Sequence, residues 1–340
     1  MPEAALNSIE VSVIIPVYNA ASYVRQAVES ALMQPEVQEV LLVEDGSPDN
    51  ALEVCQQLAA ENKRVILLRH PNGENRGAGA SRNLGMRHAT SPILAFLDAD
   101  DYYLPGRFKL DAKIYAENPL CEGVYHAVSM HIEDPEGLER WNNAGKAPDQ
   151  IQTVSAEIPS EGLAKALLEG TSGYFILDAL SIKKSVLEKA GLMHEDLRLH
   201  QDTEWILRVA MTSRLFPGSL NEPVASWRVH AQNRISAPRS PVGKLDDRLR
   251  MWEALYDWCR QNGAVQFCPT IMLRMIENAA SKQRFECKNS GKLSRRLLRV
   301  THIASWLLPH PRYALDRYFW QALKEFTSTQ PTAKPELEQL

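Results

Sequence analysis

A cluster of carboxylates directly follows a short apolar stretch in the first third of the chain. The apolar residues 93–97 run straight into Asp98, Ala99, Asp100 and Asp101. Such a stretch is typical of a strand buried in a parallel sheet, and open α/β sheets bind ligands at the carboxyl ends of these strands. Two carboxylates one residue apart suit a hard cation such as Mg²⁺ or Mn²⁺, which takes further oxygens from phosphates and water. The pattern therefore predicts a metal–diphosphate site at Asp98 and Asp100.

Three further apolar stretches alternate with helical patterns before this acidic turn. Apolar stretches bounded by turn residues are typical of strands buried on both faces. Strict alternation with short connections favours a mostly parallel, doubly wound sheet with right-handed crossovers, so we expect an α/β, Rossmann-like fold. The expected strands are 11–19, 40–43, 65–68 and 93–98, and the expected helices are 20–32, 48–58 (after Ser47 as N-cap) and one starting near residue 78.

Polar residues at the ends of the first two expected strands could hold a nucleotide base. Pro16, Tyr18 and Asn19 end the first strand, and Asp45 follows the second. A tyrosine at a strand end can stack on the face of a base, and a carboxylate can accept the imide N–H of uracil or thymine. The alternatives are that Tyr18 fills the core and that Asp45 only starts a turn before Gly46.

The glycine-rich loop 73–79 and the helix after it could bind phosphate. Backbone N–H groups at a helix start favour phosphate, and the fork of an arginine fits its oxygens. Asn75, Arg76 and Arg82 are the candidates, with ordinary surface-loop roles as the alternative. The loop lacks the third glycine of the dinucleotide fingerprint, and the chain has no Gly-Lys-Ser/Thr of a P-loop. A dehydrogenase and an NTPase are therefore disfavoured.

The pattern is less regular beyond residue 103 and becomes helical towards the end of the chain. It divides the chain into three expected parts, 1–120, 121–240 and a helical extension over 241–340. The expected elements of the second part are an edge or mixed strand within 123–133, a polar loop over 136–158, helices at 160–169, 183–190 and 202–212, and a strand at 224–229.

Composition excludes several classes of protein. The chain has 340 residues, a net charge of −4 and 44% hydrophobic residues, which fits a globular protein and gives no sign of nucleic-acid binding. No signal peptide is visible, and no apolar stretch reaches the ~20 residues of a transmembrane helix. The five cysteines are scattered, with no C-x-x-C pair. We therefore expect reduced, packed thiols in a cytoplasmic protein.

Taken together and in this order, the motifs resemble those of the family 2 glycosyltransferases, inverting enzymes with the GT-A fold. The resemblance covers residues 11–236. The matches are Pro16, Tyr18 and Asn19 to P-x-Y-N, Asp45-Gly46-Ser47 to D-G-S, Asn75 to Gly85 to N-x-G-x-x-x-A-R-N-x-G (with Ser81 for alanine), and Asp98-Ala99-Asp100 to D-x-D. Two later matches depart from the family, namely Gln201-Asp202 for E-D and Trp227-Arg228-Val229-His230 for Y-R-x-H.

The resemblance implies a role for each matching residue. Asp202 would be the general base, Asp100 the main ligand of Mn²⁺ or Mg²⁺, and Asp98 a ligand of the ribose or the metal. His230 would bind the metal or donate to the β-phosphate, unless it is simply packed, and Asp202 could also serve as an N-cap. Glu204 is the reserve base. The implied donor-binding residues are Pro16, Tyr18, Asn19, Asp45, Asn75, Arg82, Asp98 and Ala99.

The implied reaction is transfer from a nucleotide-diphosphate sugar, expected to be UDP-linked, to a hydroxyl of a glycan or lipid-linked acceptor of a bacterial surface polysaccharide. One base suffices for a single inverting displacement, because a metal can take up the charge of the leaving diphosphate. Residues 1–120 would then bind the donor, and residues 121–240 would bind the acceptor and carry the base. A sugar-phosphate nucleotidyltransferase and a non-catalytic nucleotide-sugar binder are the alternatives.

The C-terminal extension carries basic and aromatic residues together. Residues 282–317 contain nine Lys/Arg against two acidic residues, a net charge of +7, and residues 297–320 add many aromatic and aliphatic side chains. Basic helices with apolar faces suit an anionic membrane surface, so peripheral membrane contact through 282–320 is one expectation. A helical appendage packed on the protein is the other, and it could also mediate a homodimer.

Overall fold

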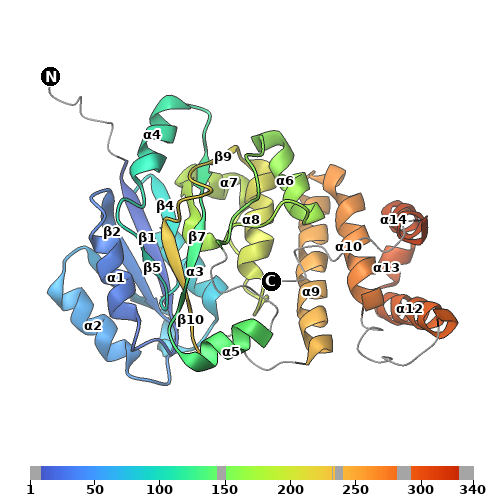
Figure 1. Ribbon diagram of the computed structural model, residues 1–340, viewed down its shortest axis with the longest axis horizontal. Helices are drawn as coiled ribbons and strands as arrows, with labels where there is room; N and C mark the ends of the chain where they lie inside the picture. Colours follow the sequence, from blue (N-terminus) through green and yellow to red (C-terminus); the bar gives the residue numbers. More distant parts are fainter. Residues whose placement is uncertain (1–8, 144–150, 232, 234–239, 282–291, 329–340) are drawn as a thin grey trace. The chain divides into compact units, whose positions relative to one another are not determined.

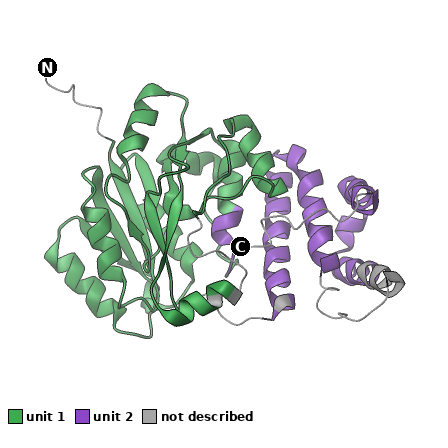
Figure 2. Cartoon of the chain, viewed as in Figure 1, with its two compact units in different colours: residues 1–198, 205–237, 336–340 green, residues 199–204, 238–335 purple. Residues whose placement is uncertain are grey.

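The structure is a computed structural model that describes residues 9–143, 151–231, 233, 240–281 and 292–328 (Figure 1). The chain forms two compact units (Figure 2). The first contains Met1–Arg198, Trp205–Ala237 and Glu336–Leu340, and the second contains Leu199–Glu204 and Pro238–Pro335.

A seven-stranded sheet forms the centre of the first unit, in the order β3-β2-β1-β4-β8-β6-β9. The strands β3, β2, β1 and β4 are parallel to one another, whereas β8 runs antiparallel to both β4 and β6. The expected α/β fold is confirmed as a mixed sheet flanked by helices. Its strands are β1 (Val11–Val17), β2 (Val37–Glu44), β3 (Val65–Arg69), β4 (Ile93–Phe96), β6 (Gly123–Tyr125), β8 (Leu180–Lys183) and β9 (Leu215–Pro217).

Helices cover both faces of the parallel part of the sheet. Alternate residues of β1, such as Val13 and Ile15, share a buried cluster with α1 (Val24–Leu32) and α2 (Ala51–Glu61). On the opposite face α3 (Ala78–His88) packs close against the sheet. A Cβ added at Gly85 of α3 would lie 2.5 Å from Ile14 Cγ2, so glycine permits this approach. Because both faces are covered, the strands read as nearly continuous apolar runs.

Two helix starts differ from the prediction because a loop carboxylate holds the chain ahead of them. Asp49 accepts hydrogen bonds from the backbone N–H groups of Ala21 and Ala51, at 2.9 and 3.2 Å. The first helix therefore begins at Val24 rather than at residue 20, and α2 begins at Ala51. Ser47, the predicted N-cap, instead donates its backbone N–H to the carboxylate of Glu44 at the end of β2.

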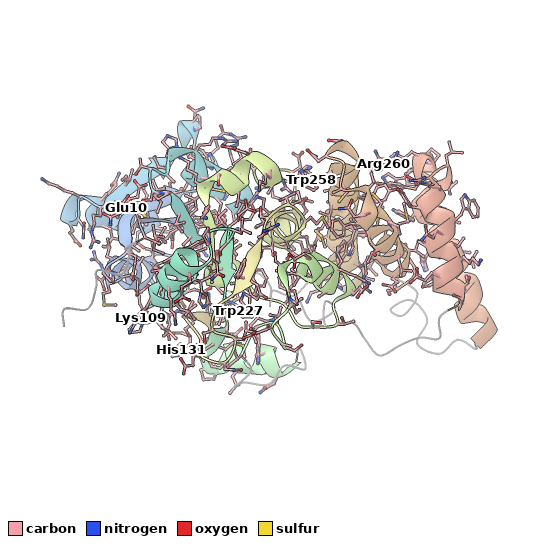
Figure 3. The ribbon with its side chains drawn as sticks, turned by 90° about the horizontal axis from the view of Figure 1, so that it is seen from above. Glu10, Lys109, His131, Trp227, Trp258 and Arg260 are labelled. Carbon is pink, nitrogen blue, oxygen red and sulfur yellow. The ribbon has the colours of Figure 1, made fainter. Side chains whose placement is uncertain are left out.

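The predicted strand within 123–133 was wrong as a single element. It forms β6 in the large sheet and β7 (Val128–Ile132) in a second, three-stranded sheet of order β5-β10-β7. In this small sheet β10 (Ala225–Val229) pairs with β5 (Tyr102–Tyr103) on one side and with β7 on the other. Figure 3 labels His131 of β7 and Trp227 of β10, which lie near each other.

The other helices of this part of the chain agree only in part with the prediction. The predicted helix 160–169 is confirmed as α6 (Ser160–Glu169). The segment predicted as helix 183–190 holds the end of β8, a 3₁₀ turn and the short α7 (Leu187–Ala190). The predicted loop 136–158 begins within helix α5 (Pro135–Asn143), and residues 144–150 lie outside the described residues. The remaining helices are α4 (Lys109–Glu117) and α8 (Gln201–Thr212).

The second unit is helical, as predicted for the C-terminal extension. Its helices are α9 (Pro241–Gln261), α10 (Cys268–Ser281), α12 (Lys292–Leu307), α13 (Pro311–Ala314) and α14 (Arg317–Ser328). None of the described helices is long and apolar enough to cross a membrane. The described cysteines, Cys55, Cys121, Cys259 and Cys268, are buried, and no disulfide joins any two of them.

Candidate active site

The acidic turn after β4 brings three carboxylates together. Asp98, Asp100 and Asp101 each offer an oxygen, and these atoms lie within 4.8 Å of one another. Asp101 is buried, whereas Asp98 and Asp100 remain partly accessible. The turn follows a strand in the middle of the sheet, so the carboxylates lie where an α/β sheet presents ligand-binding groups.

Asp98 forms an ion pair with Arg82, the arginine expected to bind phosphate. Arg82 lies on α3, its side chain is buried, and its guanidinium donates to Asp98 Oδ1. The side chain of Asp98 is 44% exposed. A buried arginine therefore sets the position of a carboxylate that can still contact a ligand.

Asp100 is held by two residues that follow β10. His230 Nε2 lies 3.1 Å from Asp100 Oδ2, and the side-chain amide of Asn233 donates to the same oxygen at 3.3 Å. The His230 ring is buried and packs against Tyr23, with 4.7 Å between ring centroids. The structure thus brings His230 to the acidic turn, 130 residues along the chain from Asp100.

Arg228 joins the acidic turn to the small sheet. Its Nε donates to the carbonyl oxygen of Asp100 at 2.7 Å, and its backbone N–H donates to Asp101 Oδ1 at 2.7 Å. The rest of its guanidinium binds Glu133 and Gln26. Sequence reasoning quoted Arg228 only as part of a motif and missed this supporting role.

Asp101 of the turn and Asp178 form a buried pair of carboxyl groups. Asp178, which precedes β8, accepts a hydrogen bond from the backbone N–H of Asp98 at 3.1 Å. Burial and the charge of Asp98 raise the pKa of Asp178 to about 7. Burial, together with the charges of Asp178 and Asp100, raises the pKa of Asp101 well above its usual value. The Asp101–Asp178 pair therefore favours the state in which the two carboxyl groups share one proton over the state in which both are ionised. Nothing in the local sequence around Asp178 marks this role.

The predicted base-contacting residues lie at neighbouring strand ends. β1 and β2 pair in parallel up to Val17 and Glu44, and the backbone N–H of Asp45 donates to Val17 O at 2.9 Å. Tyr18 follows Val17 and is 47% exposed, so its ring is available to a ligand. Pro16 lies within β1, and Asn19 adopts a positive φ of 54° in the loop after it.

Asp45 organises the glycine-rich loop. Its two carboxylate oxygens accept hydrogen bonds from the backbone N–H groups of Arg76 and Gly77, at 2.8 and 2.9 Å. Its carbonyl oxygen accepts a hydrogen bond from the Asn75 side chain at 2.9 Å. The side chain is buried, because Gly46 lets the loop come so close that a Cβ there would lie 2.6 Å from Gly73 O. Asp45 thus has a structural task besides the base contact predicted for it.

A segment before α8, residues 193–198, is tied to the same loop and to α3. Glu195 contacts Arg76 at 3.0 Å and accepts a hydrogen bond from Asn83 at 3.0 Å, and Arg87 lies 3.5 Å from it. Arg198 donates to the Asn75 side chain at 3.3 Å. These contacts were not predicted, because neither residue belongs to a recognisable motif.

Asp202, the predicted base, lies in the first turn of α8. The helix begins at Gln201, so Asp202 is inside it rather than before it, and the N-cap role considered for it was wrong. Its Oδ1 accepts the backbone N–H of Thr203 at 2.7 Å, and the residue stays partly accessible. Glu204, the reserve base, is fully buried and is therefore the poorer candidate.

Comparison with solved structures identifies the class of fold. A structure of residues 1–349 of S. aureus TarS in complex with UDP-GlcNAc superposes with a TM-score of 0.59, covering 86% of this chain and 79% of that one at 15% identity. The corresponding complex of TarS with UDP gives a TM-score of 0.57. The fold is that of the GT-A glycosyltransferases.

Sequence comparison places the protein within that class. The chain belongs to glycosyl transferase family 2, whose family model matches residues 12–168. An uncharacterized glycosyltransferase of Nostoc is 30% identical over 233 residues, 67% of each chain. The succinoglycan biosynthesis protein ExoU of Rhizobium meliloti is 40% identical over 201 residues, 58% of this chain and 56% of ExoU. The chain covers only 26–31% of the length of three matching Rickettsia glycosyltransferases.

Proposed function

We propose that this glycosyltransferase is a metal-dependent, inverting enzyme that uses a UDP-sugar and acts on a glycan or lipid-linked acceptor of a bacterial surface polysaccharide. The observation that carries the proposal is the acidic turn itself, where Asp98 and Asp100 meet Arg82 and His230 within hydrogen-bond distance. The TarS complexes with UDP and UDP-GlcNAc support a uridine donor, and the likeness to ExoU supports a polysaccharide product.

The donor would lie across the ends of β1, β2 and β4. Tyr18 would stack on the uracil and Asp45 would face its imide group, since both follow directly on paired strand ends. The diphosphate would lie towards the start of α3, where backbone N–H groups and Arg82 favour its charge. Asn75 would complete the phosphate side, and Ala99 would line the floor between Asp98 and Asp100.

The acidic turn fits a hard divalent cation. Its three carboxylates offer oxygens within 4.8 Å of one another, the ligand type that Mg²⁺ and Mn²⁺ prefer. Asp98 and Asp100 would hold the ion with His230 beside them, because burial raises the pKa of Asp101 and favours its protonated form. A bound Mn²⁺ or Mg²⁺ takes up the negative charge that develops on a leaving diphosphate.

Asp202 would act as the general base. As the acceptor oxygen bonds to the anomeric carbon, the bond between that carbon and the diphosphate oxygen breaks, and its electron pair leaves with the diphosphate. The acceptor proton passes to the Asp202 carboxylate. Attack from the face opposite the diphosphate inverts the anomeric configuration, as direct displacement does in inverting glycosidases.

A donor-hydrolysis screen tests the proposal. Wild-type protein and the variants Asp202→Asn and Glu204→Gln are incubated with Mn²⁺ and UDP-, GDP- or dTDP-sugars, and release of the nucleoside diphosphate is measured. We expect release from UDP-sugars alone, loss of release with EDTA, and a fall of about 10²–10⁴-fold in Asp202→Asn only. Release that is unchanged in Asp202→Asn would contradict the assignment of the base. Calorimetry of UDP binding separates a missing acceptor, where UDP still binds, from a wrong donor, where it does not.

A further inference from the structure

Two turns of the second unit expose leucines almost completely. Leu308 follows α12 and is 81% exposed, and Leu315 lies between α13 and α14 and is 89% exposed. A solvated turn needs no apolar side chain, and leucines at two successive turns leave apolar surface in water. The exposed leucine side chains are therefore available to contact a ligand or another surface.

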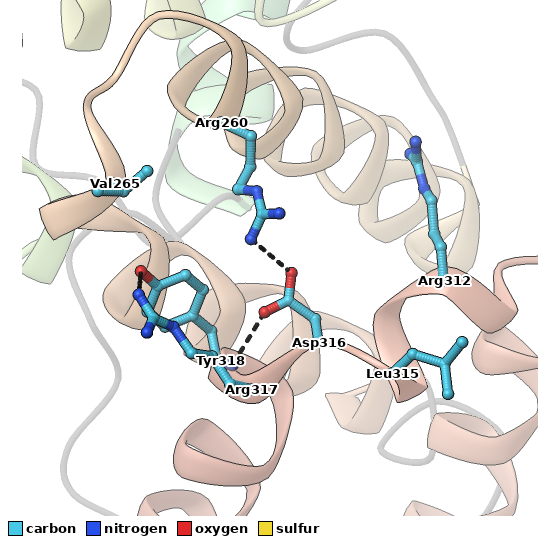
Figure 4. Close-up of a pocket in the computed structure, with 7 residues that line it drawn as sticks. All are labelled: Arg260, Val265, Arg312, Leu315, Asp316, Arg317 and Tyr318. Carbon is cyan, nitrogen blue, oxygen red and sulfur yellow. Dashed lines mark hydrogen bonds and ion pairs between the residues drawn. The ribbon is translucent and has the colours of Figure 1, made fainter.

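Leu315 lies at the edge of a hollow lined by three arginines. The hollow has a volume of about 630 Å³. Its lining residues are Arg260, Val265, Arg312, Leu315, Asp316, Arg317 and Tyr318. Asp316 pairs with Arg260 at 3.2 Å, and Leu315 points away from this pair (Figure 4). Arg312 forms an ion pair with Asp257 at 2.7 Å, but 58% of its side-chain surface is exposed, so its guanidinium remains accessible. An apolar side chain thus lies among cations that outnumber the acidic lining residue.

Trp320 extends the same apolar surface along α14. That helix buries Tyr318, Phe319 and Ala322, whereas Trp320 is 59% exposed. The indole N–H donates to Ala314 O at 3.0 Å, which places the ring against the residue that precedes Leu315. Tryptophan with one satisfied polar edge and an exposed ring is typical of side chains at a membrane–water interface.

We propose that one surface of the second unit binds the face of an anionic lipid bilayer. This surface, called the Leu315 surface, consists of Arg312, Leu315, Arg317 and Trp320. Leu315 and Trp320 would enter the headgroup region, and the two arginines would contact lipid phosphates. Membrane binding would bring the enzyme close to a lipid-linked acceptor, and this consequence rests on the proposed function.

Charge favours a bilayer over a second copy of the chain. A two-fold symmetric dimer through this surface would bring its own arginines against each other, and like charges across an interface oppose binding. Anionic lipid headgroups supply the opposite charge and the apolar region together. The membrane is therefore the occupant whose chemistry matches both kinds of side chain.

Vesicle sedimentation of the full chain tests the proposal without any need for transferase activity. Wild type is mixed with vesicles of phosphatidylcholine containing phosphatidylglycerol, or of phosphatidylcholine alone, at low and high salt. We expect binding to the anionic vesicles only, weakened by salt. Arg317→Gln and Leu315→Ser should each weaken binding by about fivefold or more, since one basic residue near the surface contributes about that factor.

Matched variants of the first unit provide the controls. Leu120→Ser removes a leucine that is 63% exposed, and Lys113→Gln removes a cation that is 57% exposed. Both should bind vesicles as wild type does. The proposal is overturned if wild type does not bind anionic vesicles at low salt, or if Leu315→Ser and Arg317→Gln bind unchanged. Dimers of wild type that dissociate in these two variants, measured by analytical ultracentrifugation, would assign the surface to a second copy instead.

Discussion

The carboxylate of Glu195 lies 3.0 Å from the guanidinium of Arg76, in an ion pair between segments 119 residues apart. Arg76 also donates its backbone N–H to Asp45, so both its main chain and its side chain are held in place. The loop proposed to receive the diphosphate is therefore ordered before any ligand arrives. Preorganisation of this kind strengthens binding, because no binding free energy is lost in ordering the loop.

Replacing Glu195 should weaken donor binding without slowing the chemical step. Glu195→Gln removes the charge that faces Arg76 and Arg87, and partly exposed pairs of this kind contribute up to about 1 kcal/mol. We expect KM for the donor to rise by about two- to fivefold while kcat stays nearly constant. Glu122→Gln, which breaks an ion pair with Lys189, is the matched control and should leave KM unchanged. An equal fall of kcat with no rise in KM would argue against a positioning role.

Asp45→Asn should impair both stability and donor binding. The variant keeps one acceptor for the two backbone N–H groups of Arg76 and Gly77, and an unsatisfied buried donor costs about 1–3 kcal/mol. Asp49→Asn is an informative comparison, since Asp49 also accepts two backbone N–H groups. Urea denaturation should show a loss in both variants, whereas calorimetry should show weaker UDP binding only in Asp45→Asn. Equal UDP affinities would place the donor elsewhere.

Asp100→Asn should weaken divalent-cation binding. Removal of this carboxylate takes away one of the two accessible acidic ligands of the turn, and we expect Mn²⁺ affinity to fall by at least about tenfold. Electron paramagnetic resonance of free Mn²⁺, titrated with protein and UDP, gives the affinity directly. Asp196→Asn serves as the control, because its side chain is 96% exposed. Unchanged Mn²⁺ binding in Asp100→Asn would remove the metal from this turn.

The buried Asp111 predicts how stability changes in acid. Burial alone would raise its pKa, but the charges of His126 and Arg107 offset this effect and lower the pKa from 3.8 to about 2. A lowered pKa adds stability that is present above pH 3.8 and is lost as the pH falls towards 2. We expect the difference in free energy of unfolding between wild type and Asp111→Asn to be about 2 kcal/mol smaller at pH 2 than at pH 4. The gap between wild type and the exposed variant Asp196→Asn should not change.

The local sequence predicted the parallel strands well, because β1, β2 and β4 are buried on both faces. Apolar stretches such as those of β1 and β4 are readily identified as strands. The polar residues that come next in the chain must then lie at the ends of these strands. The acidic turn and the start of α3 were therefore found from the sequence. The structure places the predicted His230 against Asp100.

Contacts between distant segments could not be predicted in this way. β8 has only four residues and lies directly before a segment with a helical pattern, so no local pattern predicted an antiparallel strand beside β4. Asp178 enters the site because of that strand, and Glu195 enters it through a loop without motif residues. A single carboxyl group in an ordinary loop carries no periodicity, so only the tertiary pairing reveals it.

The antiparallel β8 also orders events during synthesis of the chain. When the ribosome has made residues 1–120, the strands β3, β2, β1 and β4 exist, but Asp178, Arg228 and His230 do not. The acidic turn would then lack the partners that hold it, and one edge of β4 would remain unpaired. The parallel strands thus emerge early, whereas the acidic turn gains its partner His230 only after more than a hundred further residues have been added.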